Sequence, residues 1–233
     1  MRREEYLNRL METYRTVSVL ADKNGCRTLR LRHRAQGKDL VVRVLPQKNH
    51  AYEALCCLQS ENLPLIYDVV DLEDGQLVLE EYIEGLTVAQ VMESGRYRYR
   101  GAKRVLQGVC NGLAVLHARG LVHRDVKPEN IMIGENGRVV LIDFNASRKI
   151  SAAKRDTVVM GTVGYASPEQ LGLAQSDART DIYALGVLLN VMACGKHPGE
   201  QFARGRAGRI ARKCTCVNPA DRYQSVEKLM QAL

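Results

Sequence analysis

The sequence has no tryptophan and only two phenylalanines among its 233 residues. A hydrophobic core of this chain must therefore be built mainly from Leu, Val, Ile and Ala side chains. The composition is otherwise that of a folded protein, because 45% of the residues are hydrophobic and 26% are charged. These values argue against a disordered, fibrous or membrane-embedded chain. They suit one domain, or two small lobes that share a core.

Long apolar runs are also missing. No run approaches the roughly 18 residues that a membrane-spanning helix needs. The basic start of the chain, Met1-Arg2-Arg3, is followed by Glu4 and Glu5 rather than by an apolar stretch, so it does not form a signal peptide. We therefore expect a cytoplasmic protein with no membrane partner.

Zinc-binding cysteine spacing is absent as well. The seven cysteines include the neighbours Cys56 and Cys57 and the pair Cys214 and Cys216, but no second pair stands at zinc spacing. An odd number of cysteines in such a chain is typical of reduced intracellular thiols. The net charge of +8 favours an anionic partner. Neither an aromatic RNA-binding signature nor zinc-finger spacing is present, so we expect no nucleic-acid site.

Hydrophobic periodicity predicts a strand-rich first part. The first 48 or so residues have strand patterns, and two further strands are expected at residues 65–70 and 76–83. A helix is expected over residues 49–59, where apolar side chains recur at helical spacing.

The second part of the chain is predicted to be helical. The strongest helical pattern covers residues 102–118, and residues 182–193 are nearly all apolar, as in a buried helix. Strands followed by helices predict an α+β fold. We expect an N-terminal lobe of residues 1–83 and a C-terminal lobe of residues 84–233.

Five motifs follow one another in the C-terminal lobe. The motifs are His123-Arg124-Asp125-Val126-Lys127-Pro128-Glu129-Asn130, Asp143-Phe144-Asn145, Ser167-Pro168-Glu169, Asp181-Ile182-Tyr183-Ala184-Leu185-Gly186 and Asn218-Pro219-Ala220-Asp221-Arg222. The first matches the H-R-D-x-x-x-x-N loop of protein kinases without a gap, and the others resemble, in order and spacing, the patterns D-F-G, A-P-E, D-x-[WY]-[AS]-x-G and N-P-x-x-R of the same family. Over about residues 12–233 the chain resembles a compact bacterial-type Ser/Thr protein kinase domain. This resemblance implies a bilobal kinase-like fold with a small β-rich lobe and a helical lobe.

The resemblance also implies roles for particular residues. Asp125 would accept the proton of the substrate hydroxyl, Lys127 would steady the transferring phosphoryl group, and Thr162 would contact the catalytic Asp. Asn130 and Asp143 would bind ATP through Mg²⁺, a hard cation that suits amide and carboxylate oxygens. The positions of Lys127 and Thr162 imply transfer to Ser or Thr hydroxyls of a protein substrate.

The N-terminal lobe departs from the family. The Gly-rich loop should fall on residues 21–26, where none of the three expected glycines is in place, and a Cβ obstructs close approach of the backbone to phosphate. Arg43 stands where the ATP-anchoring Lys is expected, although Arg is longer and forked. Glu53 is the best match for its helix partner, so an Arg43–Glu53 pair is expected. Arg30 is an alternative cation.

Two further departures concern the hinge and the D-F-G motif. By register with the family, Glu80 falls at the gatekeeper position, and Glu81, Tyr82 and Ile83 form the adenine-facing hinge. Asn145 replaces the glycine of D-F-G. This change is mild, because Asn tolerates left-handed backbone better than most residues.

Two segments raise the question of partners and regulation. The basic segment Arg204–Lys213 is either a solvated helix face or a docking patch for an acidic protein. Arg124 precedes the catalytic Asp, as in kinases whose Arg binds a phosphorylated loop residue. Thr157 is the first candidate for that phosphorylated residue, and Ser151 is the second.

Two functions fit these observations. The first is an ATP- and Mg²⁺-dependent protein Ser/Thr kinase, because the catalytic motifs of the C-terminal lobe are complete. The alternative is a pseudokinase that binds partners or acts as a scaffold, with weak or no phosphotransfer, because the Gly-rich loop is altered and Arg43 replaces Lys. A small-molecule kinase fits less well, since Thr162 and Ser167-Pro168-Glu169 mark a peptide-facing segment.

Overall fold

The computed structural model describes residues 1–56, 58–150, 164–171 and 175–233. The predicted site residue Thr162 and the candidate phosphorylation sites Thr157 and Ser151 lie outside the described residues. The chain divides into two compact units. The sheet unit contains Met1–Ser60 and Pro64–Ile83, and the helical unit contains Glu61–Leu63 and Glu84–Leu233.

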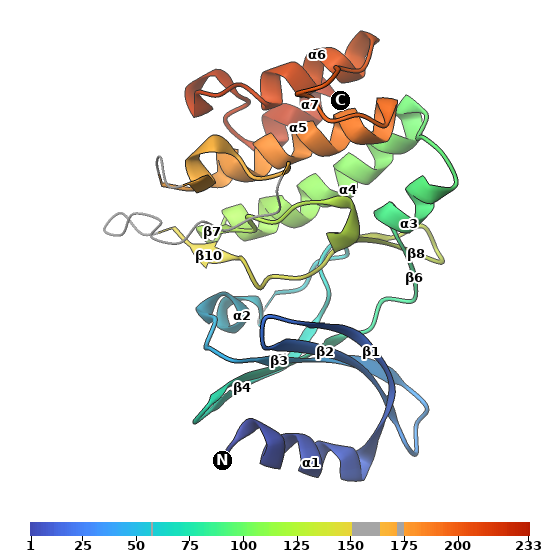
Figure 1. The fold of residues 1–233 in the computed structure, drawn as a ribbon, viewed down its shortest axis with the longest axis vertical. Helices are drawn as coiled ribbons and strands as arrows, with labels where there is room; N and C mark the ends of the chain where they lie inside the picture. The colour runs from blue at the N-terminus through green and yellow to red at the C-terminus, as the bar shows by residue number, and fades with distance from the viewer. Residues whose placement is uncertain (57, 151–163, 172–174) are drawn as a thin grey trace. The chain divides into compact units, whose positions relative to one another are not determined.

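The sheet unit is an antiparallel five-stranded sheet with two helices (Figure 1). Its strand order is β1-β2-β3-β5-β4. Side chains alternate across the sheet, so one face carries the apolar core residues Leu29, Leu31, Leu40, Val42 and Leu77. The elements are α1 (Arg3–Thr13), β1 (Tyr14–Lys23), β2 (Cys26–His33), β3 (Asp39–Leu45), α2 (His50–Leu55), β4 (Ile66–Leu72) and β5 (Gly75–Glu81).

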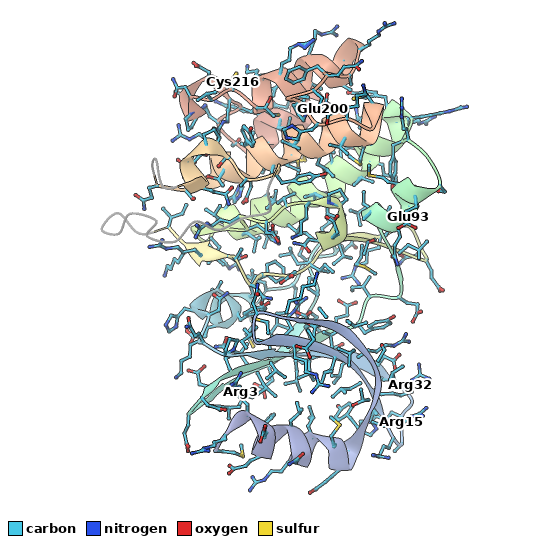
Figure 2. The ribbon with its side chains drawn as sticks, in the orientation of Figure 1. Arg3, Arg15, Arg32, Glu93, Glu200 and Cys216 are labelled. Carbon is cyan, nitrogen blue, oxygen red and sulfur yellow. The ribbon has the colours of Figure 1, made fainter. Side chains whose placement is uncertain are left out.

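Helix α1 was not predicted, since the first 48 residues were expected to form strands. Tyr6, Leu7, Leu10 and Met11 pack against the apolar face of the sheet. Because these residues stand one, three or four positions apart, they form a single apolar stripe on a helix. Arg3, labelled in Figure 2, anchors the first turn by an ion pair with Asp74 (3.2 Å). The strand prediction failed for this segment because the apolar stripe stabilises a helix only when it packs on the sheet, and the local sequence pattern does not show that packing.

The segment expected to be a Gly-rich loop is a tight hairpin. Strand β1 continues to Lys23, which pairs with Cys26 at the start of β2. Asn24 and Gly25 connect the strands with φ angles of 53° and 74°. A two-residue hairpin turn of this kind requires positive φ at both positions, which Asn and Gly supply.

The helical unit is built around α4 and α5, with α6 and α7 packed against them (Figure 1). The apolar segment 182–193 lies within α5, as predicted, and most of its side chains are buried. The elements are β6 (Gly85–Thr87), α3 (Val88–Glu93), α4 (Tyr99–His117), β7 (Leu121–Val122), η1 (Pro128–Asn130), β8 (Ile131–Gly134), β9 (Val139–Leu141), β10 (Arg148–Lys149), η2 (Pro168–Leu171), α5 (Ala178–Cys194), α6 (Gly205–Cys214), η3 (Pro219–Asp221) and α7 (Val226–Ala232).

Residues 61–63 belong to the helical unit, although the predicted boundary placed them in the first lobe. Asn62 explains this, because its Nδ2 donates to the carbonyl of Val139 (2.7 Å) and its own carbonyl accepts from Leu141 (3.0 Å). Helix α4 comes so close that a Cβ at Gly112 would lie 2.9 Å from the Asn62 oxygen. The segment is thus fixed by contacts distant in sequence, which periodicity does not reveal.

Among the helices of the described residues, none is both long enough and apolar enough to cross a bilayer.

Candidate active site

The loop between β7 and β8 brings three of the predicted site residues together. Lys127 Nζ lies 2.7 Å from Asp125 Oδ2. Asn130 Nδ2 donates to the same oxygen and to the backbone carbonyl of Asp125, both at 2.8 Å. The turn η1 (Pro128–Asn130) folds the chain back so that these side chains meet. The result is a carboxylate held in one orientation beside a cation.

A buried aspartate from α5 holds the backbone of this loop. Asp181 accepts hydrogen bonds from the backbone N–H groups of His123 (3.0 Å) and Arg124 (2.8 Å), and it contacts Nε2 of His117 (2.8 Å). Burial alone would raise the pKa of Asp181, but its contacts with His117 and the His123 N–H outweigh burial and lower it. A permanent negative charge therefore fixes the start of the loop.

His123 is completely buried beneath the loop. Its Nδ1 accepts from the backbone N–H of Asp125 (3.3 Å), and its Nε2 lies 3.2 Å from the carbonyl of Ile142. An acceptor at Nδ1 and a donor at Nε2 require the neutral ring, and burial lowers the pKa of His123 accordingly. The ring also meets Phe144 edge-on at 5.3 Å. His123 thus connects the Asp125 loop to the Asp143 segment.

The Asp143 segment is the second part of the site in the helical unit. The backbone N–H of Ile142 donates to the carbonyl of Asn130 (2.9 Å), which ties the residue before Asp143 to the loop. Asp143 and Arg124 have φ angles of 67° and 69°, in the left-handed region that non-glycine residues seldom adopt. Such strain is typical of functional sites, where the surrounding structure maintains it.

Asn130 and Asp143 have the chemistry that a magnesium ion requires. Asn130 directs its amide nitrogen at Asp125, so its amide oxygen is the group left to face a cation. Within the described residues no cluster of three or more His, Cys, Asp or Glu side chains is placed to bind a metal. Mg²⁺ commonly takes one or two protein oxygens and completes its shell with phosphates and water. The pair therefore fits a cation that arrives with a nucleotide.

The sheet unit contains a buried ion pair that sequence reasoning did not predict. Arg43 Nε lies 2.8 Å from Glu80 Oε1, and the two residues are only 5% and 2% exposed. The expected partner Glu53 is half-exposed on α2 and contacts His50 (3.2 Å). The predicted Arg43–Glu53 pair is therefore wrong. Helix α2 does not bring Glu53 to Arg43, and the neighbouring strand β5 already supplies a carboxylate.

Arg30, the alternative cation, is engaged elsewhere on the same sheet face. Its Nε donates to Asp39 (2.6 Å), and its guanidinium lies 4.0 Å from the ring centroid of Tyr82. Arg32, labelled in Figure 2, donates to Asp39 from the other side (2.6 Å). The hydrogen bond from Arg32 is the largest of the effects that lower the pKa of Asp39 to about 2. Asp39 thus holds both arginines, while Arg43 has a carboxylate of its own.

The two hinge residues of the predicted site lie at the end of the sheet unit. Glu81 ends β5, where its carboxylate accepts from the backbone N–H of Leu65 (3.1 Å) and its own N–H donates to the Leu65 carbonyl (2.8 Å). Ile83 is 8% exposed. These contacts fix the backbone on which an adenine-binding role of Glu81 and Ile83 would depend.

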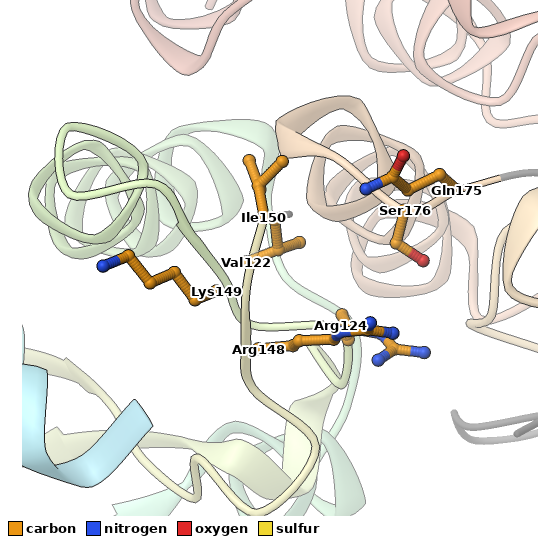
Figure 3. A pocket seen from close by; sticks show the side chains of 7 residues that line it. All are labelled: Val122, Arg124, Arg148, Lys149, Ile150, Gln175 and Ser176. Atoms are coloured by element: carbon orange, nitrogen blue, oxygen red, sulfur yellow. The ribbon is translucent and has the colours of Figure 1, made fainter. Parts of the chain in front are cut away.

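A small basic pocket lies beside the Asp125 loop. Arg124 and Arg148 lie side by side in it, and Lys149, the next residue of β10, directs its side chain away from them (Figure 3). Gln175 and Ser176 line another wall with polar groups. The pocket therefore places two arginines side by side, one of them the residue that precedes Asp125, and it suits an anion.

The basic segment Arg204–Lys213 forms α6 and the residue before it. Several of its cations have partners within the chain. Arg206 donates to the carbonyl of Ala232 (3.0 Å), Arg212 lies 4.4 Å from the ring centroid of Phe202, and Lys213 lies 4.6 Å from that of Tyr223. Cations in the last turn of a helix also complement its dipole. These contacts within the chain account for the cations at Arg206, Arg212 and Lys213.

Comparison with known sequences identifies similar proteins. The model of the protein kinase domain family matches residues 31–231. The chain is 39% identical over 150 residues to the serine/threonine-protein kinase PknL of Mycobacterium tuberculosis, which covers 62% of this chain and 37% of the relative.

Two further relatives come from other bacteria. A probable serine/threonine-protein kinase PknB of Corynebacterium glutamicum is 36% identical over 152 residues, covering 61% of this chain and 24% of the relative. A probable serine/threonine-protein kinase of Clostridium perfringens is 35% identical over 148 residues, covering 62% of this chain and 22% of the relative. The matched region spans less than two fifths of the length of each of these relatives.

Proposed function

The chain belongs to the protein kinase family, and from this we propose that it transfers the γ-phosphoryl group of ATP to Ser and Thr hydroxyls of a protein substrate. The observation that carries the proposal is the arrangement of Lys127 and Asn130 around the Asp125 carboxylate. Relatives that are named Ser/Thr kinases support the enzyme rather than the pseudokinase alternative.

The residues of the helical unit divide the chemistry among them. Asp125 orients the acceptor hydroxyl and takes its proton as the oxygen attacks the γ-phosphorus and the bond from that phosphorus to the leaving ADP breaks. Lys127 places a positive charge where the transferring group develops negative charge. Asn130 fixes Asp125 through two hydrogen bonds from one amide nitrogen, one to the carboxylate and one to the backbone carbonyl, so that little reorganisation is needed during the reaction.

We propose nucleotide-binding roles for residues of each unit, taken separately. Asn130 and Asp143 would hold Mg²⁺ through their side-chain oxygens, and Arg43 would hold phosphate oxygens. Bound Mg²⁺ neutralises the charge of the β- and γ-phosphates. Glu81 and Ile83 would present backbone groups to the adenine ring. Thr162, the cytoplasmic location and an acidic partner at Arg204–Lys213 stay predictions.

Nucleotide binding is tested by thermal unfolding with MgATP. A ligand at one hundred times its dissociation constant stabilises the folded state by about 2.7 kcal/mol. For a chain of this size, we expect the melting temperature to rise by about 5–11 °C. Asp143→Asn should lose the part of this shift that depends on Mg²⁺, while EDTA should remove the same part from the wild type.

Transfer itself is tested with ATP labelled at the γ-phosphate and casein as the acceptor protein. We expect label on Ser and Thr after phosphoamino-acid analysis, and none after Asp125→Asn. Nucleotide binding without transfer to casein or to the chain itself would favour the pseudokinase. Label on Tyr would contradict the assignment of the acceptor.

Regulation by phosphorylation follows from the basic pocket. Phosphate groups form charge-assisted hydrogen bonds with paired arginines, as in ordered activation segments of kinases. We propose that Arg124 and Arg148 bind a phosphorylated residue of the segment 143–169, with Thr157 as the first candidate. Mapping phosphorylation sites by mass spectrometry after incubation with MgATP should find phosphate in this segment. Phosphate found only elsewhere would rule the proposal out.

A further inference from the structure

The ion pair between Arg43 and Glu80 is built into the sheet. In the antiparallel register of β3 and β5, Arg43 lies opposite Val78, and Val41 lies opposite Glu80. Arg43 and Glu80 are therefore diagonal neighbours on one face, a distance that long side chains span. The Nε–Oε1 contact of 2.8 Å joins them there.

This pair differs from the one that protein kinases commonly use. In the family, the cation of the third strand pairs with a glutamate on the following helix, and activation depends on the position of that helix. Here the glutamate of that helix, Glu53, is half-exposed and contacts His50. The carboxylate beside the cation comes instead from a strand that is hydrogen-bonded to β3 along its length.

Burial makes the two residues dependent on each other. Both are at least 95% buried, and a buried charge that loses its partner is strongly unfavourable. An arginine also suits this arrangement better than a lysine. Its five N–H donors form a planar fork, which is able to hold a carboxylate through Nε and a second anion through the terminal nitrogens. The replacement of Lys by Arg and the acid at position 80 are thus explained together.

We propose that Glu80, and not Glu53, is the positioning residue for the nucleotide-anchoring Arg43. The anchor is then assembled by the register of β3 and β5, and it does not depend on where α2 lies. This inference rests on the proposed function, because it concerns how the same chain binds the phosphates of ATP.

The test compares Glu80→Gln with Glu53→Gln in steady-state kinetics with MgATP and casein. Glu80→Gln keeps the shape of the side chain but removes its charge, so Arg43 loses its ionic partner and keeps at most a weaker, neutral hydrogen bond. We expect the KM for MgATP to rise about tenfold, which corresponds to one charge-assisted hydrogen bond, with a smaller change in kcat. Glu53→Gln should raise KM much less. Glu12→Gln, an exposed acid on α1, controls for the loss of a negative charge.

A double-mutant cycle on stability tests the Arg43–Glu80 pair without an activity measurement. In urea unfolding, replacing Glu80 with Met should lower the transition midpoint strongly in the wild-type chain. The same replacement should lower the midpoint much less in a chain that already carries Arg43→Met. Should Glu80→Gln fail to fold, the double variant Arg43→Met/Glu80→Met removes both buried charges of this pair. It should fold and lose the melting shift caused by MgATP.

Two results would overturn the inference, and they are distinguishable. If Glu53→Gln raises KM as much as Glu80→Gln, Glu53 is the positioning residue. If the wild type neither transfers phosphate nor gains thermal stability with MgATP, the proposed function itself fails. A large difference between the two midpoint changes in urea would then show that the Arg43–Glu80 pair stabilises the fold and does nothing else.

Discussion

Replacing Asp125 with Asn is expected to lower the rate of phosphoryl transfer by about 10²- to 10⁴-fold, the contribution of a positioned general base. The amide keeps the shape of the carboxylate and still accepts a hydrogen bond from Asn130, but it cannot take a proton. Lys127, which lies 2.7 Å from the carboxylate, also loses its ionic partner. The measurement is kcat with labelled ATP and casein at saturating MgATP.

The fold should survive this substitution. We expect the free energy of unfolding to fall by about 1 kcal/mol, the contribution of one hydrogen-bonded contact. The melting shift with MgATP should persist, because Asn130 and Asp143 are unchanged. Asp221→Asn, at an exposed position of the helical unit, is the matched control and should keep the wild-type rate. A variant at position 125 that keeps more than a tenth of the wild-type rate would show that Asp125 is not the base.

The α+β fold class and the catalytic loop were predictable because their signals are local. The strands and the principal helices follow from periodicity within single segments. Asp125, Lys127 and Asn130 lie within six consecutive residues, so one turn decides their geometry. The structure brings these residues together, and the chemistry that the loop motif implies for them stays a prediction.

The features that were missed depend on residues distant in sequence. Glu80 lies 37 residues after Arg43, and only the register of β3 and β5 brings the two together. A signal was present, because an acid at an expected apolar position and an Arg in place of Lys are two unusual residues of opposite charge. Helix α1 was missed for a related reason, since its apolar stripe makes sense only against the sheet face that it covers.

The largest loss of stability is expected from Arg222→Ala. The guanidinium is completely buried and makes a bidentate ion pair with Glu169, at 2.6 and 2.9 Å. Glu169 also accepts a hydrogen bond from Thr180 (3.0 Å). The remaining donors of Arg222 bind three backbone carbonyls, those of Arg179, Cys216 and Val217. Removing one partner of a buried ion pair costs about 3–5 kcal/mol, because the other charge stays buried.

In thermal unfolding this loss corresponds to a melting temperature about 6–20 °C lower for a chain of this size. Arg222→Lys should fall between the wild type and Arg222→Ala, since an ammonium group cannot form the bidentate pair. Arg209→Ala, at an exposed position on α6, is the control and should stay within about 0.5 kcal/mol of the wild type.

The effect of Arg222→Ala should also depend on pH. Burial is the largest single effect and raises the pKa of Glu169, but the hydrogen bonds from Arg222, from the Glu169 backbone and from Ser167, together with the charge of Arg222, outweigh burial and leave this pKa lowered. In the wild type the resulting stability is present above the ordinary glutamate pKa, and it is lost as the pH falls through the folded-state pKa. Without Arg222, burial dominates and raises the pKa of Glu169, so acid protonates the buried carboxyl and relieves its penalty. The difference in unfolding free energy should be largest near neutral pH and shrink on acidification. A difference that stays constant in urea titrations from neutral pH down to the glutamate range would contradict the pairing of Glu169 with Arg222 as its cause.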